Sequence, residues 1–93
     1  MQYDFFRIPG TVLRDNSISC LSRLMYGVIY KYAYNGRAEF CWASNKYLSE
    51  LFEVSQDTVK RAVKELVNAG YVDAEYCRGK TRKLYPQCEL EGS

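Results

Sequence analysis

The side chains best suited to chemistry in this chain are its cations. Residues 56–83 carry seven Lys or Arg against four Asp or Glu, whereas residues 1–55 carry six against five, and residues 84–93 carry none against two. The positive excess therefore lies in one segment of a chain whose net charge is only +2. Clustered Lys and Arg attract phosphate groups, so this segment is the candidate binding surface. The alternative is an ordinary solvated face.

The chain lacks the residue patterns that usually support catalysis or metal binding. The chain has no histidine, so neither a Ser–His nor a Cys–His couple can form. Its cysteines are widely separated, unlike the closely spaced ligands of structural zinc sites. Two disulfides are possible, but we expect free, mostly buried thiols. We predict no enzyme activity, no cofactor, no metal and no small-molecule substrate. The cysteines are Cys20, Cys41, Cys77 and Cys88.

Length and composition predict one globular domain over residues 1–93. A chain of 93 residues with 47% hydrophobic and 26% charged residues can bury a single modest core. No apolar run approaches the roughly 18 residues that span a bilayer, and no leader segment is recognisable. We therefore expect a cytoplasmic protein without membrane association. Residues 1–20 are predicted to form an arm and a loop, and residues 87–93 a loose acidic tail.

The N-terminal half is predicted to support the cationic segment. Residues 3–8 favour an extended arm or short strand, laid on its own domain or exchanged with a second subunit. Leu21–Asn35 is predicted to be a helix that Ser22 caps and Asn35-Gly36 ends. This helix is apolar nearly all round, so it must be covered on more than one side. We predict a homodimer, the alternative being cover from the arm and the C-terminal hairpin.

A short apolar run, residues 38–43, predicts a strand of about four residues. Its single tryptophan, Trp42, could stack on a ligand. One lone tryptophan in a small domain is more often part of the core, and we expect that here.

Two capped helices follow. Ser44 is predicted to cap a helix over Asn45–Phe52, and Ser55 to cap a second over Gln56–Ala69 that stops at Gly70. The second helix has an apolar side for the core and a basic opposite side. Its core side is predicted to carry Val59, Ala62, Val63, Leu66 and Val67.

The segment after the second helix predicts a hairpin. Residues 71–77 alternate as a strand, residues 78–81 form the loop, and residues 82–85 return as the second strand. Cations flank the tip, where they could meet phosphates or a minor groove. The alternative is a charged hairpin without a partner.

Residues 44–72 resemble the winged helix-turn-helix signature S-N-x-x-L-A-x-x-L-G-V-S-x-x-T-V-x-R-A-x-K-E-L-x-x-A-G followed by a hydrophobic residue. In addition, FFRIP at 5–9 and LSRLMYGVIY at 21–30 are similar to N-terminal domains of plasmid and phage replication initiators. The resemblance implies an α+β fold, a winged helix-turn-helix with three helices and a small antiparallel β-sheet or hairpin wing. Two positions depart from the signature. Glu53 stands where glycine is common in a left-handed turn, and Ser49 replaces the usual alanine.

The resemblance implies sequence-specific binding of double-stranded DNA in replication initiation or transcriptional regulation of a plasmid, phage or other mobile element. The alternative is a protein-interaction module on the same scaffold. In the recognition helix, we expect DNA contacts from Gln56, Asp57, Thr58, Lys60, Arg61 and Lys64. At the helix starts, we expect phosphate contacts from Ser44, Asn45, Lys46 and Ser55. In the wing, we expect contacts from Arg78, Lys80, Thr81, Arg82 and Lys83.

Overall fold

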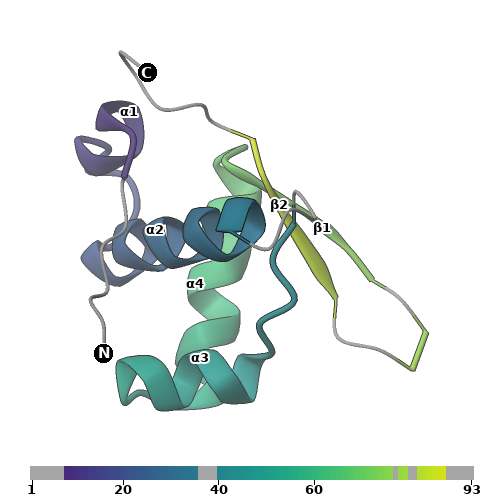
Figure 1. Cartoon of the computed structure of the whole chain (residues 1–93). Coiled ribbons are helices and arrows are strands. Elements are labelled where there is room, and N and C mark those ends of the chain that lie inside the picture. The colour runs from purple at the N-terminus through teal and green to yellow at the C-terminus, as the bar shows by residue number, and fades with distance from the viewer. Residues whose placement is uncertain (1–7, 36–39, 77, 80–81, 88–93) are drawn as a thin grey trace.

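The computed structural model describes residues 8–35, 40–76, 78–79 and 82–87. Its elements follow the order α1 (Gly10–Leu13), α2 (Cys20–Asn35), α3 (Asn45–Phe52), α4 (Gln56–Asn68), β1 (Val72–Glu75) and β2 (Lys83–Pro86). Figure 1 shows α2 and α3 lying across α4, with the β1–β2 hairpin reaching out to one side. The α+β winged helix-turn-helix architecture is therefore confirmed, and the described residues form four helices in place of the predicted three.

The additional helix is α1, a single turn that begins directly after Pro9. Leu13 and Arg14 donate their backbone N–H groups to the carbonyls of Pro9 and Gly10, at 2.9 and 3.0 Å. Buried Val12 anchors the turn in the core. One turn of helix is too short to show a periodic pattern, so the sequence predicted only a loop here. Most of the predicted arm over residues 3–8 lies outside the described residues.

The prediction that Ser22 caps α2 was wrong. The helix begins at Cys20, and the Ser19 hydroxyl accepts the Ser22 backbone N–H at 3.1 Å. Ser22 lies inside the helix, is fully buried, and donates its hydroxyl to the Glu65 carboxylate at 2.5 Å. Serine is a favoured N-cap residue, so residue type alone allows either Ser19 or Ser22 to cap α2. The choice was decided by Glu65, a residue of another helix.

The two helices of the motif begin where predicted, and α4 ends at Asn68, one residue before the predicted Ala69. Ser44 and Ser55 accept the backbone N–H groups of Tyr47 and Thr58, so each satisfies one of the free donors at a helix start. Between the helices, Glu53 has a φ of 58°, the left-handed conformation anticipated at this position. After α4, the chain turns at Gly70, whose φ is 86°.

The hairpin is antiparallel, with Val72 opposite Pro86 and Glu75 opposite Lys83. The predicted strand over residues 38–43 is reduced, within the described residues, to one isolated bridge between Cys41 and Leu84. Two backbone hydrogen bonds of 2.8 and 3.0 Å join these residues. The wing is thereby fixed to the segment that precedes α3.

Trp42 is not a core residue, contrary to our expectation. Its side chain is 43% exposed and packs edge-on against Phe40. Cys41 occupies the buried position instead, because neighbouring residues of an extended segment point to opposite sides.

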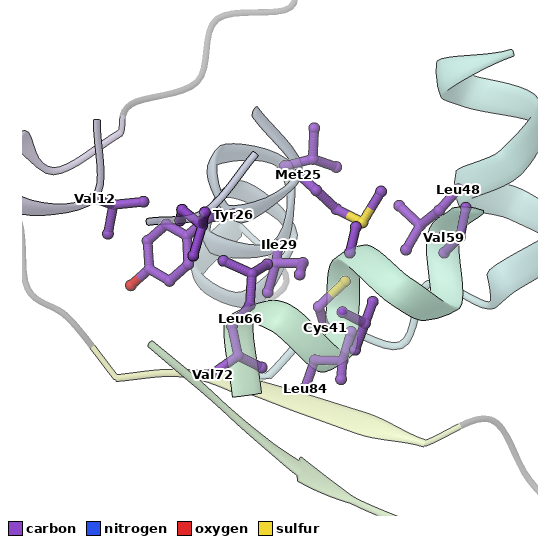
Figure 2. Packing of buried hydrophobic residues seen from close by; sticks show 14 residues of the cluster. Val12, Met25, Tyr26, Ile29, Cys41, Leu48, Val59, Leu66, Val72 and Leu84 are labelled. Carbon is purple, nitrogen blue, oxygen red and sulfur yellow. The ribbon is translucent and has the colours of Figure 1, made fainter. Parts of the chain in front are cut away.

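The core lies between α2, α4 and the inner side of β2 (Figure 2). Figure 2 shows Met25, Ile29, Leu66 and Leu84 directed toward one another from these elements. Contacts with α1, α4 and β2 cover most of α2, although Leu24 and Tyr32 stay partly exposed. Within the described residues, no helix is long and apolar enough to cross a membrane.

Candidate nucleic-acid interface

The two sides of α4 differ sharply. Val59, Ala62, Val63 and Leu66 are buried in the core. On the opposite side, Asp57, Arg61, Lys64 and Asn68 follow the spacing i, i+4, i+7 and i+11, which places them in one stripe along the helix. All four side chains are exposed. The helix therefore presents a polar, mainly cationic edge while its other side holds it in place.

A groove of about 690 Å³ runs between this stripe and the wing. The stripe, Lys60, Val63 and Val67 form the α4 side, and the wing forms the opposite side. Asn45, the first residue of α3, also contributes. The wing residues that line the groove are Asp73, Ala74, Tyr76 and Arg82. The fold thus joins α4, the start of α3 and the hairpin into one concave surface.

The cations on α4 are available to a partner. Among the residues that the structure describes, no hydrogen-bond or ion-pair partner lies within reach of the Lys60, Arg61 or Lys64 side chains. A phosphate backbone would attract such cations at the surface.

Comparison with known proteins identifies the architecture. Residues 18–72 match the family described as Helix-turn-helix domain. The chain belongs to this family. The match runs from before α2 to the first residue of β1, so it covers the whole helix pair and its supporting helix. No curated protein and no solved structure matches the chain significantly.

Within this helix-turn-helix domain, the predicted residues at the helix starts have different environments. Ser44 and Ser55 use their hydroxyl oxygens as caps, and the Thr58 hydroxyl lies 2.9 Å from that of Ser55. Asn45 lines the groove, and its Oδ1 is buried without a hydrogen-bond partner among the described residues. Lys46 and Gln56 are exposed outside the groove lining.

The predicted wing residues divide into two groups. Arg78 is exposed near the tip, while Lys80 and Thr81 lie outside the described residues. Arg82 is partly buried, and its Nη1 donates to the Ala43 carbonyl at 3.0 Å. Lys83 holds its Nζ 4.9 Å from the centre of the Phe40 ring and 5.5 Å from that of Trp42. The last two cations therefore make contacts within the fold as well as carrying charge.

The environment of Arg82 is unusual for a surface cation. Burial lowers the pKa of its guanidinium, although arginine stays charged at neutral pH. Its Nη2 is buried and has no hydrogen-bond partner among the described residues. One arm of the guanidinium thus anchors the wing through the Ala43 carbonyl.

Six residues of the groove were not predicted as DNA contacts. Three are apolar, Val63, Val67 and Ala74, and three are polar, Asn68, Asp73 and Tyr76. The helical spacing from Asp57 could have identified Asn68. Tyr76 is 77% exposed, and strand alternation alone did not show that it borders the recognition helix. Its proximity to α4 depends on how the hairpin packs.

The described cysteines are free thiols. Cys41 is buried, and burial raises the pKa of its thiol, which keeps it protonated and unreactive. Cys20 is exposed. Cys77 and Cys88 lie outside the described residues. Within the described parts of the chain, no cluster of His, Cys, Asp or Glu could hold a metal ion.

Proposed function

We propose that this helix-turn-helix domain binds double-stranded DNA in a sequence-specific manner, without catalysis. The observation that carries the proposal is the groove lined by the exposed cations of α4 and by the wing. A major groove about 12 Å wide admits one α-helix, and residues near the start of that helix reach the base edges. The buried inner side of α4 holds the helix in an orientation that allows this.

We assign base contacts to exposed side chains in the first two turns of α4, and Arg61 is the principal one. It lies in the stripe, lines the groove, and has the five-donor fork that suits guanine O6 and N7. Gln56 and Lys60 are further candidates. We assign phosphate contacts to Lys46, Lys64 and Arg78. Thr58 is a weaker candidate because its hydroxyl lies against the cap of α4.

The biological setting that we propose is replication initiation or transcriptional control in a plasmid, phage or other mobile element. The support is the similarity of the segments at residues 5–9 and 21–30 to replication initiators. Footprinting on DNA near the gene distinguishes the two roles. Protection of several spaced repeats supports initiation, and protection of one site over a promoter supports regulation.

The binding proposal is tested with random duplex DNA and with a site selected from a random library. Affinity for random duplex should fall steeply between about 50 and 200 mM salt, because each phosphate contact releases counterions. Arg61→Ala should weaken binding to the selected site by ~1–3 kcal/mol. Arg14→Ala removes the same charge from a residue outside the groove and serves as the control. Absence of duplex binding at either salt concentration would overturn the proposal.

One surface outside the groove favours a homodimer. Leu24 and Tyr32 of α2 and Tyr47 and Leu51 of α3 are each at least 40% exposed, and the two tyrosine hydroxyls lie 2.6 Å apart. We propose that this apolar surface contributes to a homodimer that reads two half-sites. Sedimentation equilibrium tests the dimer. A wild-type monomer at all concentrations would contradict it.

A further inference from the structure

We propose that Asp57 reads a cytosine in the major groove and is a specificity-determining residue of α4. The inference rests on the proposed function and adds a base preference to it. It concerns Asp57, the one acidic side chain that α4 contributes to the groove, whose wing side contributes Asp73.

The position of Asp57 is that of a base-reading residue. It lies in the first turn of α4, at the end of the stripe that continues through Arg61 and Lys64. Its side chain is exposed and lines the groove. Lys60 and Arg61 are three and four residues further along the helix, the spacing at which an ion pair could form. Among the described residues, however, Asp57 has no ion-pair or hydrogen-bond partner.

The charge of Asp57 limits what it can contact on DNA. Phosphates repel a carboxylate, so this residue weakens non-specific binding wherever α4 enters a groove. A carboxylate only accepts hydrogen bonds, and the N4 amino group of cytosine donates one in the major groove. Adenine also donates from N6, but its N7 acceptor lies beside that group and repels the carboxylate. Cytosine is therefore the favoured partner.

Stabilisation of the helix dipole is the other role open to Asp57, since a carboxylate in the first turn interacts favourably with the helix start. That role requires negative charge and gives no preference for any base. The two roles therefore differ in what a neutral replacement of similar shape does to different DNA sequences. Asn keeps the size of Asp and removes the charge, and its amide pairs with adenine through N6 and N7.

The test compares the full wild-type chain with Asp57→Asn on a duplex selected from a random library. The variant should bind the selected site about 5- to 150-fold more weakly, the range for loss of one specific base contact. It should bind random duplex more tightly, because one repulsive charge is gone. Changing a single C·G pair of the site to A·T should restore its binding. Asp57→Glu keeps the charge but moves the carboxylate by one methylene, and should lose the cytosine preference without gaining affinity for random duplex.

The outcomes separate this inference from the proposed function. Equal changes of Asp57→Asn on the selected and random duplexes overturn the cytosine contact and leave DNA binding intact. If the sites selected from the library share no cytosine at a fixed position, the cytosine contact is also overturned and DNA binding is left intact. Failure of the wild-type chain to bind any duplex overturns both. Thermal unfolding of each variant is measured alongside. If the loss of DNA affinity is explained entirely by a smaller folded fraction of the variant, that result also counts against the contact.

Discussion

Glu65 is the residue that ties the recognition helix to its support. Its carboxylate accepts the Ser19 backbone N–H at 2.9 Å and the Ser22 hydroxyl at 2.5 Å. These two hydrogen bonds, the backbone one first, lower the pKa of Glu65 below its ordinary value of 4.5. Because Ser22 is buried, solvent water does not reach its hydroxyl and cannot take the place of the Glu65 carboxylate as hydrogen-bond acceptor. One side chain of α4 thereby satisfies both the start of α2 and a buried hydroxyl.

We predict that stability falls as the pH drops below about 5. A carboxylate with a lowered pKa in the folded state is charged in both states at neutral pH, but the unfolded chain binds its proton first on acidification. Asp15 acts in the same direction, since hydrogen bonds from Ser17 and Tyr71 lower its pKa below 3.8. Glu65→Gln should be less stable at pH 7 and show a shallower loss between pH 5 and 3. Urea unfolding at several pH values measures this, and an unchanged slope would contradict the role of Glu65.

Arg82 and Arg78 form a matched pair within the wing. Arg82→Ala removes the bond to the Ala43 carbonyl and should destabilise the fold by about 1–2 kcal/mol. Arg78 is exposed, so Arg78→Ala should stay within about 0.5 kcal/mol of the wild type. Both should weaken DNA binding and reduce its salt dependence. Urea midpoints separate the two, and equal midpoints would show that the bond of Arg82 adds nothing to stability.

The turn between α3 and α4 has a left-handed backbone at Glu53, a position where glycine would be favoured. Glu53 is, within the described residues, the one non-glycine with a positive φ. Its N–H donates to the Ser49 carbonyl, which closes the end of α3. The helix pair is held by core contacts on both sides of this turn, so the backbone stays left-handed at a cost of about 1 kcal/mol.

Glu53→Gly is therefore predicted to stabilise the domain by up to about 1 kcal/mol. Glycine removes the left-handed strain, although its freedom in the unfolded chain offsets part of the gain. The control is Glu50→Gly, in which the same residue type is replaced inside α3 and about 1 kcal/mol should be lost. Thermal unfolding compares them. Destabilisation by both substitutions would show that the turn carries no strain.

Taken as a whole molecule, the domain depends on one small core that also fixes the position of the wing. Leu84 of β2 is fully buried, and its backbone pairs with Cys41. The same residue therefore belongs to the core and to the hairpin that lines the groove. Damage to the core should displace the wing as well as lower stability.

Leu84→Ala is expected to cost about 2–5 kcal/mol, since it leaves a cavity in a core that relaxes only partly. This is a large share of the roughly 5–15 kcal/mol available to a small domain. Leu13→Ala removes the same atoms from a side chain that is 51% exposed and lies outside the proposed dimer surface, and should cost less than about 1 kcal/mol. Denaturant unfolding measures both. Equal losses would contradict the assignment of Leu84 to the core.

Local chemistry accounts for the features that were predictable. Ser44 and Ser55 cap their helices, Gly70 ends α4, and Glu53 takes the left-handed turn, because each depends on a residue and its neighbours within a few positions. Helical periodicity likewise identified the buried side of α4 and its cationic opposite side. The helix-turn-helix family and the α+β fold follow from these local patterns, since a motif of two short helices has few ways to bury its apolar sides.

Contacts between distant segments decided the rest. Ser19 caps α2 in place of Ser22 because Glu65, more than forty residues away, takes the Ser22 hydroxyl. Arg82 is partly buried because the Ala43 carbonyl lies beside it, and Trp42 is exposed because Cys41 points into the core. The sequence by itself determined the helix pair and its charge. Only the tertiary structure determined which cations line the groove, since that depends on where the wing packs against α4.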